Sequence, residues 1–273
     1  MAVPGRPTPQ PEIEGRRPRF ADRAPEEYRQ PDANPFVRLH RTHGPPLLPA
    51  SEAQRYRGRW DAAFGRSAPL HLEIGSGNGF FLAELARRNP DWNVLGIELR
   101  YKRTVLCAKK IAAVGADNAR IARYHAAYLD DLFLPGDLAG IYVNHPDPWP
   151  KARHEKNRLI SRWFLEDCAR YLVPGGWLRL KSDFADNIDR VAGLLAAGPE
   201  GEPLPRLPLE VTGRSEDVIT GPAPWPDDIE TNYQSKFRKR GLPVYAIALV
   251  RTDAPFASVR VHDEVLLEEH EDR

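Results

Sequence analysis

The sequence predicts an α/β fold with a doubly wound, mostly parallel sheet of seven strands. One observation is that short apolar runs alternate with longer segments whose apolar residues recur at helical spacing, the pattern of βαβ units. A second is that a glycine-rich turn follows the first of these runs, and that an acidic residue closes the next. Nucleotide-binding folds carry glycines and an acid at these two places, so both observations favour the same architecture.

The predicted strands are short apolar runs at 70–74, 93–97, 120–124, 140–143, 176–181, 209–212 and 244–250. Helical periodicity fills the intervals between them at 79–89, 100–114, 157–172, 184–197 and 229–240. Pro174-Gly175-Gly176 marks the connection from one of these helices to the next strand. Strands and helices in this alternation place helices on both faces of the sheet.

Composition excludes several classes of protein. The 39 Lys and Arg residues nearly balance the 38 Asp and Glu residues, so only local clusters of charge can argue for a nucleic-acid partner. The amino terminus lacks the apolar core of a signal peptide, and no apolar run is long enough to span a membrane. Cys107 and Cys168 lie in helix-like patterns and are predicted to be buried thiols in a reducing compartment. We therefore expect a soluble cytoplasmic protein.

Residues 73–79, Glu-Ile-Gly-Ser-Gly-Asn-Gly, connect the first predicted strand to the first predicted helix. Glycine permits a tight turn whose backbone can approach a ligand, so Gly75 and Gly77 are candidate cofactor-binding residues, with Glu73 in front of them. The dinucleotide fingerprint needs a small residue where Phe80 stands, which disfavours a nicotinamide oxidoreductase. The spacing instead resembles the first motif of class I S-adenosylmethionine methyltransferases.

Two further polar residues stand at predicted strand ends. Glu98 closes the second strand, where a carboxylate can accept hydrogen bonds from both ribose hydroxyls of a nucleoside. His125 follows the third strand and is placed to contact an adenine ring. The alternative interpretations are a helix cap for Glu98 and a structural role for His125.

The most informative stretch is 144–158, Asn-His-Pro-Asp-Pro-Trp-Pro-Lys-Ala-Arg-His-Glu-Lys-Asn-Arg, which follows a buried apolar run. Asp147 stands between two prolines beside Trp149, so a rigid acid-aromatic loop lies at the carboxyl end of a strand, where open α/β sheets bind ligands. A flat ring can stack on Trp149 while Lys151 and Arg153 hold phosphates. This combination indicates chemistry on a base within a nucleic acid.

Five segments together resemble the bacterial tRNA (guanine-N7)-methyltransferase family, and they cover nearly all of residues 70–250. The most distinctive is Asp-Pro-Trp-Pro-Lys-x-Arg-His at 147–154. The other four are Glu-Ile-Gly-Ser-Gly at 73–77, Gly-Ile-Glu at 96–98, Lys-Ser-Asp at 181–183, and Thr-Asn-Tyr at 231–233 with Phe237. The resemblance implies a Rossmann-like class I methyltransferase that transfers a methyl group from S-adenosylmethionine to N7 of a guanine in the variable loop of tRNA.

The resemblance also implies roles for single residues. Glu73, Glu98 and Asp147 match donor-site positions, and Asp147 is also the implied catalytic acid. The implied substrate contacts are Lys151, Arg153, Asp183, Thr231 and Gln234. Guanine N7 carries its own lone pair, so we expect Asp147 to orient the reactants and to stabilise developing positive charge, and not to remove a proton.

Two residues depart from the family's pattern. His125 stands where many members have Asp or Asn, and Gln234 stands where the family has Glu. That Glu offers a carboxylate to the N1–H and amino protons of guanine, whereas an amide oxygen is a neutral acceptor. Two outcomes remain open: weaker binding of guanine, or an acid supplied by Asp183 or Asp147.

The two ends of the chain have biased compositions. Residues 1–50 contain 11 of the 27 prolines, many arginines and few apolar residues, so we expect a disordered tail rich in proline and arginine. This tail is either an arm that contacts RNA or a solvated segment without a partner. Residues 263–273 are acidic and are expected to fray, which leaves 51–262 as the methyltransferase domain.

Two other functions fit parts of the sequence. Residues 146–149, Pro-Asp-Pro-Trp, are similar to the motif of methyltransferases that act on exocyclic amines, but they lack its second consecutive proline. A non-catalytic RNA-binding scaffold would keep the fold without a working donor pocket, and His125 and Gln234 are the features that favour it. The sequence leaves the oligomeric state open between monomer and homodimer. It predicts no metal site, because no further ligand accompanies His40 and His43.

Overall fold

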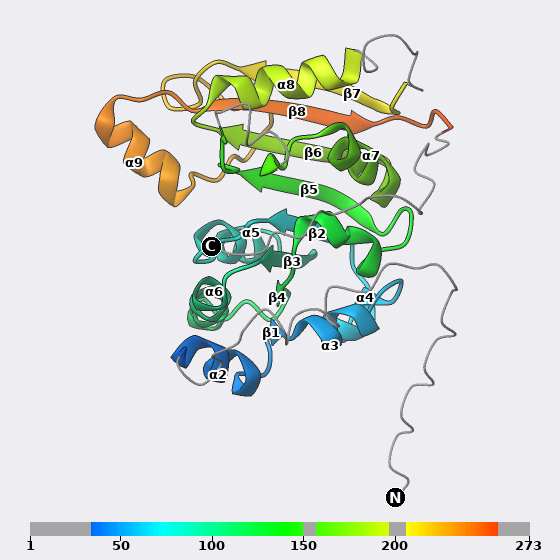
Figure 1. Cartoon of the computed structure of the whole chain (residues 1–273), viewed down its shortest axis with the longest axis vertical. Coiled ribbons are helices and arrows are strands. Elements are labelled where there is room, and N and C mark those ends of the chain that lie inside the picture. Colours follow the sequence, from blue (N-terminus) through cyan, green and yellow to red (C-terminus); the bar gives the residue numbers. More distant parts are fainter. Residues whose placement is uncertain (1–33, 150–156, 197–205, 256–273) are drawn as a thin grey trace, which may run out of the picture.

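A computed structural model of the chain describes residues 34–149, 157–196 and 206–255. Its centre is one sheet of eight strands in the order β1-β4-β3-β2-β5-β6-β8-β7 (Figure 1). The strands are β1 (Leu47–Leu48), β2 (Leu70–Ile74), β3 (Asn93–Glu98), β4 (Ala119–Arg123), β5 (Leu138–Asn144), β6 (Leu172–Ser182), β7 (Leu209–Ser215) and β8 (Tyr245–Arg251). The α-helices are α2 (Pro35–Thr42), α3 (Ala50–Arg55), α4 (Trp60–Phe64), α5 (Phe80–Arg88), α6 (Tyr101–Ala113), α7 (Arg162–Tyr171), α8 (Ala185–Ala196) and α9 (Asn232–Arg240), and η2 (Ala126–Asp131) is a 3-10 helix.

The sheet is parallel from β1 through β6, and only β8 runs antiparallel, to both β6 and β7. The predicted α/β fold with a mostly parallel sheet is therefore confirmed, with eight strands in place of seven. The additional strand is β1, which pairs with β4 through Leu47 and Leu48. Two residues are too few to show a periodicity, which is why the sequence pattern does not reveal this strand.

The amino-terminal boundary differs from the prediction. Residues 34–50, predicted to belong to a disordered tail, form α2, β1 and the start of α3. The side chain of Asn34 caps α2 by accepting a hydrogen bond from the amide of Phe36 at 3.0 Å, and Val37 is buried. A few apolar residues suffice here because Val37, Leu47 and Leu48 are buried against the domain, a property that composition does not record. Residues 1–33 and the predicted acidic tail at 263–273 lie outside the described residues.

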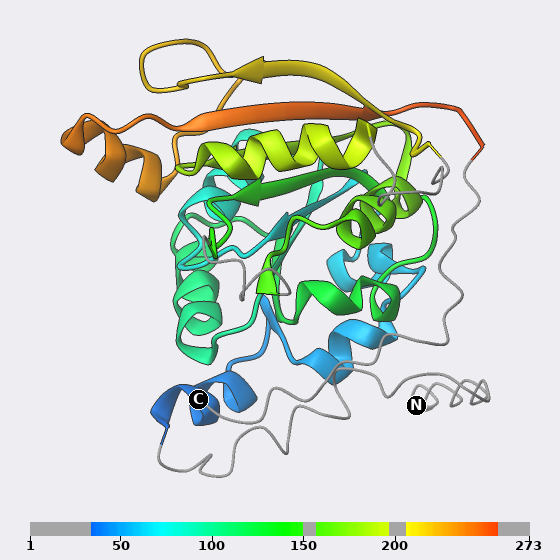
Figure 2. The same ribbon diagram turned by 45° about the horizontal axis from the view of Figure 1, so that its top comes forward.

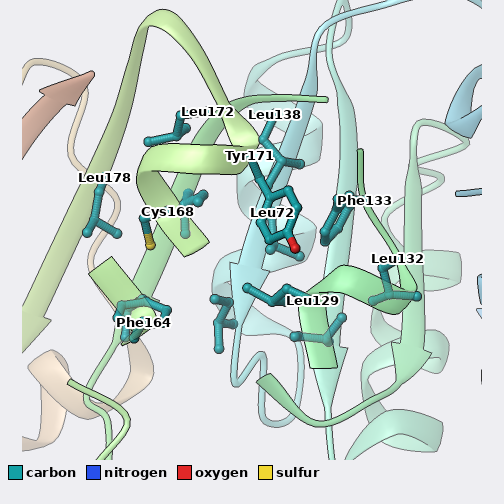
Figure 3. Packing of buried hydrophobic residues seen from close by; sticks show 14 of the residues in the cluster. Leu72, Leu129, Leu132, Phe133, Leu138, Phe164, Cys168, Tyr171, Leu172 and Leu178 are labelled. Carbon is teal, nitrogen blue, oxygen red and sulfur yellow. The ribbon is translucent and has the colours of Figure 1, made fainter. Parts of the chain in front are cut away.

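Helices cover both faces of the sheet (Figure 2). On β2, Leu70, Leu72 and Ile74 alternate with residues that point to the other face, as expected for a strand. The face that carries Leu72 packs against α3, α4, η2, α7 and α8, and Figure 3 shows Leu72 beside Phe133 of the segment after η2 and Tyr171 of α7. The opposite face packs against α5 and α6.

The order of the strands reverses between β2 and β5. From β2 the chain builds β3 and β4 on one side, and it then returns to the other side of β2 as β5. The register aligns Ile74 with Val143, so the loops after β2 and β5 leave the sheet at the same level. This switch point is where open α/β sheets bind ligands. In Figure 1 the arrowheads of β5 and β6 point toward α9, which lies at this edge.

Two predicted boundaries move for local reasons. Helix α7 begins at Arg162, later than predicted, because the side chain of Ser161 caps it by accepting from the amide of Phe164 at 3.2 Å. Strand β6 begins at Leu172, and the Pro-Gly-Gly turn interrupts the register between Leu172 and Trp177. Among the described residues, no helix has the length and apolar character needed to cross a bilayer.

Candidate functional site

The turn after β2 combines left-handed glycines with open space. Gly75 and Gly77 have φ angles of 76° and 54°, which residues with a side chain rarely adopt. A Cβ added at Gly75 would meet nothing within 4 Å, and one at Gly77 would meet nothing closer than 4.0 Å. At Gly79 an added Cβ would lie 2.5 Å from the sulfur of Cys107, so this glycine serves the packing of α5 on α6. Only the first two glycines border space for a ligand.

Glu73 lies buried at the end of β2, with 2% of its surface exposed. Asn144 donates a hydrogen bond from Nδ2 to Oε1 of Glu73 at 3.1 Å, whereas Oε2 has no partner among the described residues. Burial raises the pKa of Glu73 to about 7, although the hydrogen bond from Asn144 lowers it. A buried carboxylate oxygen without a donor is suited to bind a cationic or N–H group of a ligand.

Glu98 ties the glycine turn to the end of β3. Its Oε2 accepts from the amide of Gly77 at 3.0 Å, and its Oε1 accepts from the amide of Arg100 at 2.9 Å. Because Arg100 is the residue that precedes α6, this second bond resembles the helix-cap role that was the alternative for Glu98. Each carboxylate oxygen can accept a second hydrogen bond, so the predicted contact with ribose hydroxyls is compatible with these bonds.

His125 caps η2. Its Nδ1 accepts from the amide of Ala127 at 3.0 Å, and the ring is exposed at the carboxyl end of β4. The structural role expected as the alternative for His125 is therefore present, and its contact with adenine stays a prediction.

The loop after β5 presents an acid to solvent. Asp147 is exposed, and its carboxylate makes no hydrogen bond or ion pair with any residue that the structure describes. On either side of it, His145 and Trp149 have φ angles of 52° and 41°. Such left-handed backbone in a residue other than glycine costs about 1–3 kcal/mol and persists only where the surroundings hold it.

Hydrogen bonds hold the loop after β5 at several points; its described residues, 145–149, are called the acid loop below. The amide of His145 donates to the carbonyl of Lys181 at 2.8 Å, which extends the pairing of β5 with β6. Arg158 donates from Nε to the carbonyl of Trp149 at 3.0 Å, and Asn187 approaches the carbonyl of Pro146 at 3.5 Å. The loop therefore holds Asp147 in a defined place beside the glycine turn.

His145 was not singled out by the sequence reasoning, yet it joins three parts of the site. Its side chain is only 4% exposed, and its Nε2 lies 2.9 Å from Oγ1 of Thr231. Its Nδ1 lies 3.5 Å from Oδ1 of Asp183, which follows β6. The imidazole of His145 beside it lowers the pKa of Asp183, although at this distance Nδ1 makes no hydrogen bond with the described residues. The available sequence clue was a polar ring placed directly after a buried strand, two residues before the acid.

Thr231 and Gln234, both predicted to contact the substrate, form the capping box of α9. Oγ1 of Thr231 accepts from the amide of Gln234 at 2.9 Å, and Oε1 of Gln234 accepts from the amide of Thr231 at 3.5 Å. The buried ammonium of Lys181 donates to the same Oε1 at 2.9 Å and to Asp228 at 2.6 Å. The carbonyl oxygen of Gln234 is thus engaged inside the protein, and the residue is 2% exposed.

Cations accompany the site on α9. Lys236 lies over the ring of Tyr233 at 5.2 Å, and Arg238 pairs with Glu230 at 3.1 Å. Lys239 and Arg240 are exposed in the last turn of the helix. The predicted substrate residues Lys151 and Arg153 lie outside the described residues.

The structure thus gathers the predicted site residues at one edge of the sheet. The glycine turn with Glu73, the end of β3 with Glu98 and the acid loop lie on adjacent strands, and Asp183 and Thr231 are joined to that loop through His145. Within the described ranges, no group of three or more His, Cys, Asp or Glu side chains is arranged to hold a metal ion. The arrangement can hold a nucleoside on the glycine turn and place a carboxylate beside it.

Comparison with known proteins gives one consistent result. A family model described as "Putative methyltransferase" matches residues 67–246. The chain is 33% identical to a tRNA (guanine-N(7)-)-methyltransferase of Bacillus velezensis, over 71% of this chain and 85% of that protein. It is 35% identical to the enzyme of the same name from Geobacillus kaustophilus, over 75% and 88%.

Among solved structures, the 16S rRNA methyltransferase KamB matches with a TM-score of 0.51 over 71% of this chain and 93% of that chain. Its sequence identity of 15% makes this a likeness of fold alone. The family model, in contrast, spans the glycine turn, the loop after β5 and α9. The chain therefore belongs to the tRNA (guanine-N7)-methyltransferase family.

Proposed function

We propose that this protein transfers a methyl group from S-adenosylmethionine to N7 of guanine in tRNA, at the guanosine of the variable loop. The observation that carries the proposal is the pair of loops at the switch point. One is an open glycine turn, and one oxygen of the adjacent Glu73 has no partner among the described residues. The other holds the exposed Asp147 on a backbone that hydrogen bonds fix in place. Members of the same family carry the name of this activity.

The residues present fit the donor. Gly75 and Gly77 leave space for a ligand above the turn, and Glu73 offers one unpartnered oxygen to a cationic amino group. Glu98 retains acceptor capacity for ribose hydroxyls. When bound, S-adenosylmethionine supplies a methyl group activated by its sulfonium charge.

The reaction needs no strong base, because N7 of guanine carries no proton that must be removed before it attacks. Guanine N7 attacks with an in-plane lone pair, and the purine becomes positively charged as the bond forms. A carboxylate fixed nearby stabilises that charge more in the transition state than in the ground state, which accelerates the reaction. Asp147 meets this requirement, because it is ionisable and exposed and because its loop is anchored to β6.

The substrate side lies between the acid loop and α9. Asp183 offers a partly exposed carboxylate, and Thr231 fixes the start of α9, whose last turn carries exposed cations. Phosphates of the tRNA backbone bind to these cations and to Lys151 and Arg153. Such contacts make affinity depend on salt concentration.

The decisive experiment is nucleoside analysis of tRNA after incubation with the protein and the donor. We expect 7-methylguanosine; methyladenosine or methylcytidine without it would instead support a methyltransferase of exocyclic amines. Calorimetry with the donor adds a second criterion, since a non-catalytic scaffold with a closed pocket would show no heat of binding.

Asp147→Asn tests the role of the acid. Because Asp147 has no partner in the described structure, the variant should unfold at the same temperature as the wild type and bind tRNA normally. Loss of transition-state stabilisation should lower kcat by about 10²–10³-fold. Asp91→Asn is a matched control, because Asp91 is also an exposed acid between a proline and a tryptophan, at the opposite end of the strands. Equal losses in both variants would contradict the assignment.

A further inference from the structure

The acid loop turns one side chain inward and one outward. His145 and Asp147 are two residues apart, yet the imidazole is buried and the carboxylate is exposed. The left-handed backbone of His145, at φ 52°, is strained for a residue with a side chain. The contacts of the imidazole with its surroundings stabilise this strained conformation.

The polar atoms of the ring have a defined arrangement. Nε2 of His145 lies 2.9 Å from Oγ1 of Thr231, and a hydroxyl can either donate to a ring nitrogen or accept from it. Nδ1 lies 3.5 Å from Oδ1 of Asp183 and makes no hydrogen bond with the described residues. Because a carboxylate can only accept, this neighbour favours the tautomer with the proton on Nδ1, in which Nε2 accepts from Thr231. The ring therefore accepts from α9 and donates toward the residue that follows β6.

The faces and the backbone of His145 complete the connection. Tyr233 and Phe237 lie with their ring centroids 5.6 Å and 5.7 Å from that of His145, so the imidazole packs against α9. The backbone amide of His145 is bonded to the carbonyl of Lys181 at 2.8 Å. One residue thus contacts β6, the residue after it, and two turns of α9.

Of the candidate acceptors for guanine, Gln234 is already engaged inside the protein, whereas Asp183 remains available beside Asp147. The carbonyl oxygen of Gln234 receives hydrogen bonds from Lys181 and from the amide of Thr231, inside the protein. The side chain of Asp183 is 33% exposed, and the neighbouring imidazole of His145 lowers the pKa of its carboxyl, which favours the ionised form. An ionised carboxylate can accept from both N1–H and the amino group of guanine, a pairing that other bases do not offer.

We propose that His145 is a positioning residue for guanine selection, which orients the carboxylate of Asp183 and holds it in register with Thr231 and Asp147. The inference rests on the proposed function, because it concerns how that same site recognises its base. His145 acts through Asp183 and does not touch the reacting atoms. The alternative role is apolar packing against Tyr233 and Phe237, which any ring of similar size would supply.

The test compares tRNA transcripts that carry guanosine or inosine at the methylated position, since inosine lacks only the 2-amino group. The wild type should prefer guanosine in kcat/KM by about tenfold or more, the size expected for a hydrogen bond to a charged group. His145→Phe keeps the ring but removes both polar contacts, and it should bring the preference close to one while donor affinity stays unchanged. Asp183→Asn should do the same, and the double variant should lose no more than either single variant.

Two further variants keep the result interpretable. Phe237→Leu loosens the same packing without touching a polar atom, so it should retain the preference for guanosine. His145→Gln supplies an amide that can accept and donate, and it should keep part of the preference for guanosine. If His145→Phe does not fold, His145→Leu replaces it, because leucine also removes both polar atoms.

A preference that survives in His145→Phe but is lost in Asp183→Asn would overturn the inference. So would a loss of preference in Phe237→Leu as large as in His145→Phe. Absence of any N7 methylation by the wild type would refute the proposed function itself, a result distinct from both.

Discussion

Glu73→Gln should make the protein more stable at neutral pH and weaker at binding the donor. The carboxyl of Glu73 is buried with one oxygen unpartnered, and its pKa is raised from 4.5 to about 7. The folded state therefore binds a proton that the unfolded state releases between these pH values. Stability from this group is present below pH 4.5 and is lost as the pH rises toward 7.

The size of the effect follows from the shift. A difference of about 2.5 pKa units, at about 1.4 kcal/mol per unit, amounts to about 3.5 kcal/mol above neutral pH. Glutamine has the shape of the protonated acid and keeps an oxygen for the hydrogen bond from Asn144. It therefore avoids the burial of a charge, and the variant should gain most of this free energy.

Urea unfolding followed by tryptophan fluorescence, at several pH values from about 5 to 8, measures the difference between variant and wild type. Taking the difference removes the titration of all other groups. The difference in the free energy of unfolding between variant and wild type should grow with pH and should level off above the pKa of Glu73. Calorimetry at the same pH values should show donor affinity reduced about ten- to hundredfold, since a charge-assisted hydrogen bond is lost.

Glu98→Gln is the matched control, because it weakens a neighbouring donor contact but leaves Glu73 in place. Its stability should still fall as the pH rises, by somewhat less than in the wild type, because burial is the main cause of the raised pKa of Glu73 and the charge of Glu98 adds to it. A Glu73→Gln variant whose stability runs parallel to that of the wild type would refute the burial argument. A variant that gains stability and binds the donor normally would refute the assignment of Glu73 to the donor site.

The other variants test single residues. Lys181→Met removes the buried ammonium that donates to Asp228, Ile229 and Gln234, and it should destabilise the protein by about 3 kcal/mol in urea unfolding. The exposed Lys239→Met should have little effect. Gly79→Ala should lower the melting temperature because its Cβ would collide with Cys107. Gly75→Ala carries the same strain of a left-handed backbone but meets no atom, so it should lose less stability and should reduce donor affinity; a larger loss of stability in Gly75→Ala would contradict the open-space argument. His71→Phe should make the protein more resistant to acid. Burial lowers the pKa of His71 from 6.5 to about 3, so the stability that the neutral ring contributes is lost as the pH falls through this range. Unfolding of the variant and the wild type at the same acidic pH would count against this argument.

The parts of the molecule that obey local rules could be predicted from sequence. The periodicity of apolar residues located the strands and helices. The three glycines within residues 73–79 indicated a tight turn between the first strand and the first helix. The placement of Asp147 at a strand end followed from the apolar run before it. These inferences needed no knowledge of which segments meet in space.

The contacts that join distant segments could not be predicted in the same way. His145 and Thr231 are 86 positions apart, and Lys181 and Asp228 are 47 apart, so no sequence pattern connects either pair. Gln234 was interpreted as a weakened substrate contact because its partner Lys181 was unknown. Once the two are seen together, the amide is part of the support of α9.

The edge position of β1 has a practical consequence for anyone who shortens this chain. Removal of residues 1–50 would strip away a helix and a strand that cover β4 and α6, leaving unpaired backbone groups along β4 and uncovered apolar side chains. Such a truncation should aggregate, whereas one that starts at Asn34 should remain monodisperse. Trimming guided by proline content alone would therefore cut into the folded body.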